Sequence, residues 1–402
     1  MDPAQRAQLL ATKLRVLVTE HAAGARPEGV VRPGEHRSEA EERSPNVTAG
    51  ARPEGVVRPG EHRSEAEERS PSVTAWEVRA DTLVPVAFFA GAAALVAKVL
   101  FVLVEPSTAE RDPMDTDPSA QPRPPRGWLG GVVVLAQRHG CTEVNLLGDM
   151  LTGDDARRAS RSMIPIRVWS IAGRVLTSVD PVDHVAPDAA SAEALAFEST
   201  IVAAGADPVI EHGVLRAEVR GLEVARTQVD PHDGITRLEV GVGRHDRLAQ
   251  AMMNQGQDPA LSLRNAVESV LVHRRSGASS HPANQIAVSR WLRYAVASHP
   301  EWVGCTALTL LQSAEAPQLK RLSAALLLGD SDAGPTVVAC SVGVDLDAAI
   351  DAVDAGVFLG ASRVVLCLPE TYNLPAVRIV AGALTLAVEV VVVAADWADR
   401  TG

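Results

Sequence analysis

Acidic residues recur through a strand-like stretch in the middle of the chain, between residues 211 and 247. Glu218, Glu223 and Glu239 are the members of this stretch that could do chemistry. Two carboxylates on neighbouring strands can hold a divalent cation, Mg²⁺ or Mn²⁺, which activates water for phosphodiester hydrolysis. Side chains alternate between the two faces of a strand, so Glu218 and Glu223 share a face only if a bulge near Gly221 interrupts the alternation.

The elements that must position these acids are expected on both sides of them. We expect a helix at 189–204, strands at 207–211, 214–228 and 236–243, and helices at 260–274 and 284–298. This order, with one acid on the second strand and one on the third, resembles the core of the PD-(D/E)xK nucleases. The resemblance implies that Glu223 and Glu239 bind the metal and that Glu218 is an accessory acid. Gly241 stands where that family has lysine; Arg244 could supply a cation there, although a protonated arginine cannot act as a base.

The same acids also have a purely structural interpretation, as solvated carboxylates on a strand face paired with arginines. Arg216, Arg220, Arg226 and Arg237 are the candidate partners. Residues 216–275 hold nine arginines and eight acids, so this stretch carries +1 in a chain of net charge −12. A nucleic-acid face is compatible with the stretch, whereas the whole chain repels polyanions at long range.

A second candidate site lies near the C-terminus, where apolar strands at 335–344, 362–368 and 388–394 alternate with helices at 346–355 and 374–384. Strands this apolar are covered on both faces, as in a small Rossmann-like α/β unit. Asp345 and Glu370 follow the first two strands, at the edge where such folds bind ligands or cofactors. Asp347 is expected to cap the following helix. Neither GxGxxG nor GxxxxGK[ST] occurs, so no nucleotide motif supports this site.

The first half of the chain predicts a third α/β unit. It contains a helix at 128–139, a strand at 142–148, a helix at 153–162 and a strand pair at 165–177. The apolar run 83–104 has the length of a membrane helix, but Lys98 and Pro85 argue for a strand at 83–89, a helix at 90–98 and a strand at 99–104. A short amphipathic helix at 3–19 and the absence of a secretory signal lead us to expect a cytoplasmic protein. Its four cysteines should then be buried free thiols.

A tandem duplication joins this helix to the rest of the chain. Residues 23–48 are repeated at 49–74 with 25 of 26 positions identical, the exception being Asn46 against Ser72. Each copy is rich in Pro, Gly and charge and offers only one Val pair to a core. This composition favours a disordered arm.

We therefore expect a multi-domain α/β protein with four parts: 1–74, the helix and the arm; 75–180, an α/β domain; 181–310, an α+β domain of nuclease-like outline; and 311–402, the Rossmann-like domain. The patterns GLEVAR, LEVGVGRHDR, VHRRSGASSHPAN and CSVGVDLD resemble a family of uncharacterised actinobacterial proteins. That resemblance implies one shared architecture over much of 130–402 and implies no activity. Two functional hypotheses follow: a divalent-metal nuclease relative, and a non-catalytic ligand-binding or regulatory protein.

Overall fold

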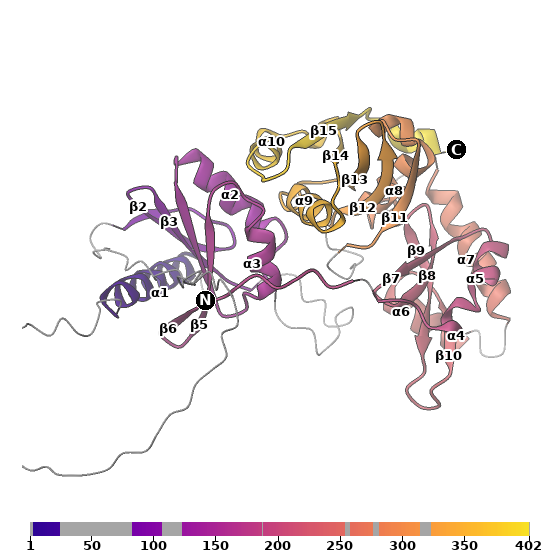
Figure 1. Ribbon diagram of the computed structural model, residues 1–402. Coiled ribbons are helices and arrows are strands. Elements are labelled where there is room, and N and C mark those ends of the chain that lie inside the picture. Colours follow the sequence, from indigo (N-terminus) through magenta and orange to yellow (C-terminus); the bar gives the residue numbers. More distant parts are fainter. Residues whose placement is uncertain are drawn as a thin grey trace, which may run out of the picture.

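The computed structural model describes residues 3–24, 83–106, 123–186, 188–253, 258–275, 281–313 and 323–401 (Figure 1). Helices and strands are mixed, as expected, and the strands form three sheets. We call the corresponding parts the N-terminal unit (3–24 and 83–178), the central unit (192–273) and the C-terminal unit (288–401). Apart from its first two residues, the duplicated segment lies outside the described residues.

The N-terminal unit is a six-stranded sheet in the order β1-β2-β3-β4-β5-β6, in which β3, β4 and β5 run parallel. Its elements are α1 (Pro3–Gly24), β1 (Val84–Val86), β2 (Gly91–Val96), β3 (Val99–Val104), α2 (Trp128–Arg138), β4 (Glu143–Gly148), α3 (Gly153–Ala159), β5 (Ile166–Ala172) and β6 (Val175–Ser178). The predicted helix at 3–19 and strand at 99–104 are confirmed. No helix among the described residues is long and apolar enough to cross a membrane.

The predicted helix at 90–98 is wrong, because this segment is strand β2 and the turn that follows it. Ala97 adopts a φ of 51° in that two-residue turn, and β2 pairs antiparallel with β3. Ala92 and Ala94 face α1 and pack against its Leu10 and Leu14. Pairing with the apolar strand β3 therefore outweighs the helix propensity of alanine.

The C-terminal unit repeats the plan of the N-terminal unit. Its elements are α8 (Val288–Ser298), the 3₁₀ helix η3 (Pro300–Val303), β11 (Ala307–Leu311), β12 (Ala325–Ser331), β13 (Gly334–Cys340), α9 (Ala348–Leu359), β14 (Arg363–Pro369), η4 (Glu370–Tyr372), α10 (Pro375–Ala381), β15 (Val388–Val393) and η5 (Trp397–Thr401). The predicted strands and helices of this region are present, and β11 and β12 are additional. The sheet order is β11-β12-β13-β14-β15, and three neighbouring strands, β13, β14 and β15, again run parallel.

The two units match in register as well as in order. Val144 is paired with Ile166 across β4 and β5, and Val364 is paired with Val388 across β14 and β15. A hairpin with a two-residue turn precedes the parallel strands in both units. One helix covers the outer face of each sheet, α1 in the first and α8 in the second. The chain thus contains an internal structural repeat, distinct from the 26-residue duplication.

The repeated units face each other through their inner helices (Figure 1). Leu129 of α2 and Val353 of α9 belong to one continuous apolar core that spans both sheets. Ser162, just after α3, forms an antiparallel bridge with Leu384, just after α10. Pairing of equivalent residues is the contact that an approximate two-fold axis generates.

The central unit is an antiparallel four-stranded sheet in the order β10-β9-β8-β7. Its elements are α4 (Ala192–Leu195), α5 (Glu198–Ala203), β7 (Asp207–Glu211), β8 (Val214–Val219), β9 (Leu222–Val229), β10 (Thr236–Val240), α6 (Gly243–Met253) and α7 (Pro259–His273). The single strand predicted at 214–228 is wrong, because Arg220 and Gly221 form a hairpin turn with φ of 48° and 77°. Likewise, the helix predicted at 189–204 is two short helices, and the third strand ends at Val240.

Glu218 and Glu223 are cross-strand partners in this hairpin and so lie on one face of the sheet. A register shift between Ala217 and Glu218 accompanies the pairing, close to where a bulge was needed. The opposite face is apolar, with Leu215 and Val224 packed beneath α7 and its neighbours.

Candidate functional site

Glu223 lies buried at the centre of a group of arginines. Its carboxylate accepts a hydrogen bond from Arg226 Nε at 2.6 Å and one from Arg247 Nη1 at 3.2 Å, and a third from Arg216. Burial alone would raise the pKa of Glu223, but these guanidinium groups hold it below its ordinary value. The negative charge of the Glu223 carboxylate is therefore neutralised by the three guanidinium groups around it.

Glu218 pairs with arginines that come from α8, outside the central sheet. Its two carboxylate oxygens accept from Arg290 Nη1 and from Arg293 Nη2, each at 2.6 Å. The same two arginines also pair with Glu211, which lies on β7. Leu292 and Val296 of α8 pack on the C-terminal sheet. This helix therefore joins the C-terminal unit to the central unit, with an apolar face toward the first and arginines toward the second. We call the arginine-paired acidic side of the central sheet, with Glu211, Glu218 and Glu223, the ionic face.

Glu239 and Arg244 lie at the open side of this ionic face. The Glu239 side chain is 42% exposed, and its carboxylate lies 3.6 Å from Arg247 Nε. Glu223 and Glu239 thus converge on the guanidinium of Arg247, a cation that the protein supplies itself. Arg244 is exposed in the first turn of α6. Within the described ranges, no group of three or more His, Cys, Asp or Glu side chains could hold a metal ion.

Asp345 faces the N-terminal unit and is 4% exposed. Its carboxylate accepts from Arg126 Nε at 3.0 Å. Burial, with the negative charges of Asp347 and Asp351 nearby, raises the pKa of Asp345 to about 6 although Arg126 opposes the rise. Glu370 is exposed at the start of η4 and belongs to no such cluster.

Asp347 is the N-cap residue of α9, as expected, but its side chain makes no cap hydrogen bond to that helix and caps α2 instead. Its carboxylate accepts from the backbone N–H groups of Gly127 at 3.1 Å and Gly130 at 2.7 Å, at the start of α2 in the other unit. A side chain on Gly130 would collide with the backbone of Leu346, so the close approach requires glycine. The carboxylate occupies the anion site that this helix N-terminus creates.

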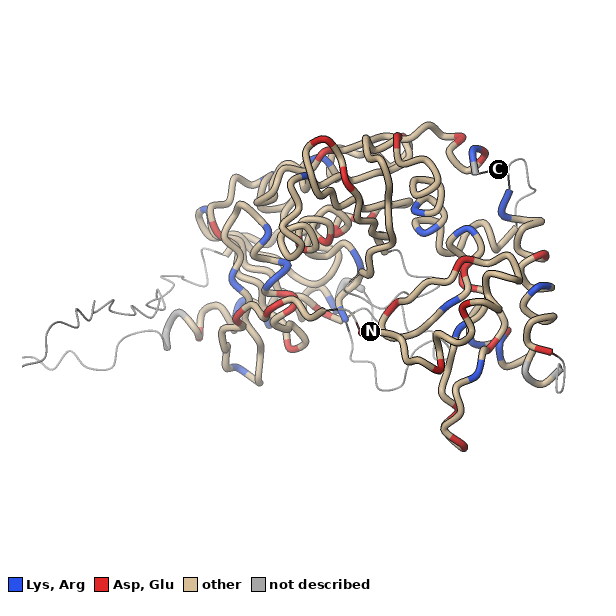
Figure 2. The backbone as a smooth tube through the Cα atoms, turned by 45° about the vertical axis from the view of Figure 1, so that its right-hand side comes forward, with Lys and Arg blue, Asp and Glu red and all other residues tan. Residues whose placement is uncertain are grey.

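Asp345 and Asp347 belong to a larger ionic junction between the repeated units (Figure 2). The N-terminal unit supplies only arginines and the C-terminal unit only aspartates across this interface. The junction residues are Arg126, Arg157, Arg158 and Arg161 on one side and Asp345, Asp347, Asp351 and Asp354 on the other. Equal numbers of opposite charges in a buried interface fix the orientation of the units.

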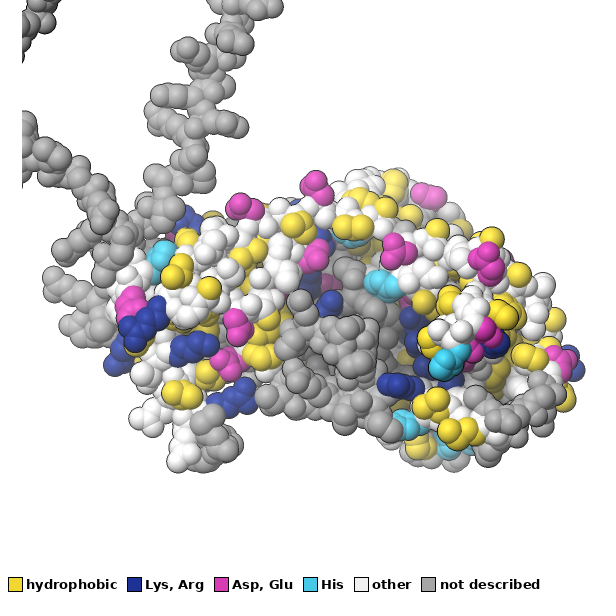
Figure 3. All heavy atoms as spheres, turned by 90° about the horizontal axis from the view of Figure 1, so that it is seen from below, with side chains coloured by type: hydrophobic (Ala, Val, Ile, Leu, Met, Phe, Trp, Pro, Cys, Tyr) yellow, Lys and Arg dark blue, Asp and Glu magenta, His cyan; other side chains and the backbone are white. Residues whose placement is uncertain are grey.

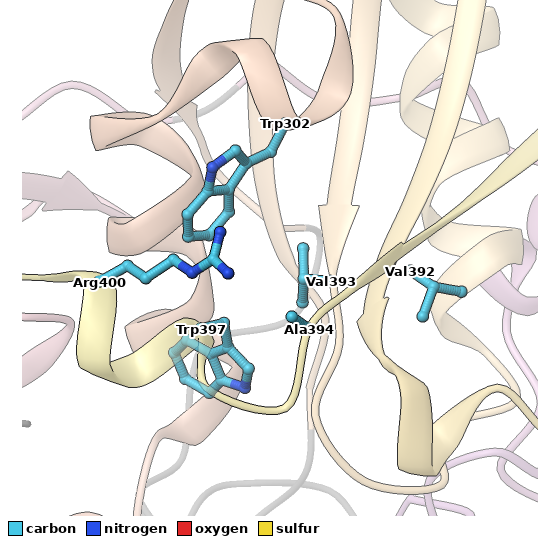
Figure 4. Close-up of a pocket in the computed structure, with 6 residues that line it drawn as sticks. All are labelled: Trp302, Val392, Val393, Ala394, Trp397 and Arg400. Atoms are coloured by element: carbon cyan, nitrogen blue, oxygen red, sulfur yellow. The ribbon is translucent and has the colours of Figure 1, made fainter. Parts of the chain in front are cut away.

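A cavity of about 210 Å³ opens beside the carboxyl end of β15 (Figure 4). Its walls are the indoles of Trp302 and Trp397, and its floor is formed by the end of β15, with Val392, Val393 and Ala394. Arg400 reaches between the two indoles. His299 stacks on Trp302 with 4.8 Å between ring centroids and hydrogen-bonds the carbonyl of Arg400 at 3.1 Å. The cavity thus joins aromatic walls to one half-exposed guanidinium, which is paired with Asp396 at 3.4 Å.

Comparison with models of protein families, with curated proteins and with solved structures finds no match to this chain. Function therefore has to be inferred from the geometry. The cavity residues were not singled out in the sequence. Six tryptophans in 402 residues are few, so the two placed at 302 and 397, just after an amphipathic helix and a buried strand, were the available signal.

The face drawn in Figure 3 shows no broad basic patch among the described residues. On the face in Figure 3, acidic, basic and apolar side chains are interspersed wherever the structure describes them. Three of the nine arginines that made 216–275 locally basic are turned inward: Arg216, Arg247 and Arg274 are buried. Arg274 donates to three backbone carbonyls, those of Arg220, Ala283 and Ile286.

Proposed function

We propose that this chain is a non-catalytic binding protein and that its ligand binds in the cavity beside β15. The observation that carries the proposal is the contrast between the candidate sites. Glu218, Glu223 and Asp345 are buried and paired with arginines, whereas the cavity is concave, accessible and lined by groups that bind ligands. A metal ion at Glu223 would have to displace guanidinium groups that already compensate its charge.

The lining of the cavity specifies the chemistry of the ligand. Indole and valine surfaces favour an apolar or aromatic group, and the guanidinium of Arg400 favours a carboxylate or another anion beside it. The volume of about 210 Å³ is smaller than the roughly 300–1,000 Å³ typical of small-molecule sites. The ligand should therefore insert one small apolar group rather than a whole cofactor.

A matched pair of small probes tests this chemistry on the full chain. Calorimetric titration with 4-phenylbutyrate and with the uncharged 4-phenylbutanol should show binding of both, with the acid bound about tenfold more tightly, the effect of one charge-assisted contact. Trp302→Ala should abolish binding of both probes. Arg400→Ala should remove only the preference for the acid, and Arg174→Ala, an exposed arginine on the N-terminal unit, should change neither.

Equal affinities in the wild type and in Trp302→Ala would contradict the proposal. The alternative, a divalent-metal nuclease acting through Glu223 and Glu239, makes a separate prediction. Plasmid and branched DNA should then be cleaved in Mg²⁺ or Mn²⁺ and left intact by the Glu223→Gln, Glu239→Gln double variant. Our proposal predicts that neither protein cleaves. Cleavage by the wild type that is lost in Glu239→Gln alone, a variant whose exposed side chain should leave the fold intact, would overturn it.

A further inference from the structure

The internal repeat shows what is missing beside the cavity. In the N-terminal unit, β5 is followed by β6, which pairs with it antiparallel and completes the sheet. In the C-terminal unit the equivalent strand, β15, is the last of its sheet. The chain leaves β15 after Val393 and turns to the outer face, where Trp397 packs on Trp291 of α8.

The matching registers identify equivalent residues in the two edges. Ile166 and Val388 occupy the same position, so Ile171 of β5 corresponds to Val393 of β15. Ile171 is the cross-strand partner of Leu176 on β6. Leu176 is buried on the outer face of its sheet, in the same apolar cluster as Trp169 and the Leu17 side chain of α1.

Among the described residues, no strand fills the corresponding place beside Val393. Val393 lies on the outer face of its sheet, in the cluster that contains α8, and it lines the cavity between Trp302 and Trp397. The cavity therefore occupies the position that Leu176 fills in the other copy of the fold. The cavity could therefore accept one side chain of an additional strand paired with β15, as Leu176 of β6 packs beside β5.

The edge of β15 is also suited to pairing. Natural sheets protect exposed edges with lysine, proline or a bulge, and an edge without them is a site for strand addition. β15 reads VEVVVV, and neither lysine nor proline occurs in it. Its one charged residue, Glu389, is paired with Arg363 on the neighbouring strand.

We propose that an extended segment of a partner protein adds to β15 as an antiparallel strand, with a leucine-like side chain opposite Val393 in the cavity. The segment carries an acidic side chain beside this anchor, since Arg400 lines the same cavity. The inference rests on the proposed function and names its ligand: a peptide strand with an apolar anchor and a negative charge.

The test uses a peptide that copies the strand found in the other unit. A fluorescently labelled peptide of residues 173–180, GRVLTSVD, is titrated against the full chain and followed by anisotropy. We expect saturable binding that weakens about tenfold when the leucine of the peptide is replaced by alanine, the loss that a buried isobutyl group implies. Methylation of the backbone nitrogens on one edge of the peptide should abolish binding, because a strand ladder needs those donors.

Protein variants assign the binding to this edge. Trp302→Ala should abolish it, and Arg400→Glu should reverse the preference between versions of the peptide that carry aspartate or lysine at the position of Arg174, two residues from the leucine and on the same face of the strand. If 4-phenylbutyrate binds in a Trp302-dependent manner while no peptide does, the strand inference fails and the proposed function stands. If neither probe binds, both fail. A concentration-independent homodimer in light scattering that Val392→Lys dissociates would show that a second copy occupies the edge, and would overturn the partner assignment.

Discussion

Arginine pairing decides the role of the buried acidic side chains that the structure describes. Glu223, Glu218 and Asp347 each accept from at least two donors while buried, and each therefore holds structure together. A carboxylate so placed is costly to remove, because its partners keep their charge in a site with little water.

Replacing Glu223 by glutamine should be strongly destabilising. Arg216, Arg226 and Arg247 would then share a buried site without the carboxylate that compensates them. We expect the free energy of unfolding, measured by urea denaturation, to fall by about 3–5 kcal/mol. Glu239→Gln is the matched control: its side chain is 42% exposed, so the loss should stay below about 1 kcal/mol. Similar losses from both variants would contradict a structural role for Glu223.

Asp345 gives the ionic junction a pH dependence of defined sign. Its pKa of about 6 in the folded protein lies above the ordinary 3.8, so the folded state binds the proton more tightly. This contribution to stability is fully present below about pH 4 and is lost as the pH rises through about 6. Arg126, Asp347 and Asp351 are the charged groups that face it.

The measurement is the difference in melting temperature between the wild type and Asp345→Asn, from pH 4 to pH 8. The melting temperature of the wild type should rise relative to that of the variant as the pH falls from about 7 to about 4. Acids with lowered pKa values, such as Asp351 and Glu223, act in the opposite direction but are present in both proteins, so they largely cancel. A difference that does not vary with pH would refute this assignment.

At the scale of elements, the hairpin turn at Gly221 positions both the ionic face and α8. The φ of Gly221 is 77°, and a Cβ there would lie 2.3 Å from the backbone of Arg290. Gly234 has a similar φ of 72° in a turn with nothing within 4 Å of such a Cβ. Comparing substitutions at the two glycines therefore distinguishes the cost of backbone strain, present at both, from the cost of a steric clash, present only at Gly221.

Alanine at Gly234 should cost only the strain of a left-handed residue, about 1–2 kcal/mol. Alanine at Gly221 should cost clearly more than that, because α8 must also move away from the central sheet. Thermal unfolding of both variants provides the comparison, and equal losses would mean that the contact with Arg290 yields easily.

The sequence predicted the elements wherever periodicity and local propensity agreed, as for the β13-α9-β14-α10-β15 series. It failed where the partner of a segment decided its conformation, as for the alanine-rich β2. Both glutamates of the ionic face were identifiable as paired acids, but Arg290 and Arg293 were not, because they lie about 70 residues away and reach the sheet only through packing. The internal repeat left only faint traces, such as Gly140-Cys-Thr-Glu-Val against Gly360-Ala-Ser-Arg-Val.

At the scale of the whole molecule, the two duplications should differ sharply in importance. Deleting residues 49–74 removes one copy of a polar sequence that offers a single Val pair, so the melting temperature should be unchanged within about 1 °C, a negligible free-energy change. Leu14→Asp, in the α1 helix that precedes it, should unfold the N-terminal unit, because Leu14 is 1% exposed against the sheet. A large loss from the deletion would show that the arm belongs to the fold.

The one-sided junction, with every arginine in the first unit and every aspartate in the second, has a consequence for biosynthesis. Arg126 and Arg158 leave the ribosome roughly 200 residues before Asp347 and Asp351 do, a delay of about 10–40 s at ordinary elongation rates. During that time the first sheet is complete, yet α2 and α3 expose an apolar surface ringed by arginines whose aspartate partners in the second unit have not been made. Nascent chains stalled between residues 180 and 340 should accordingly be the species most dependent on chaperones.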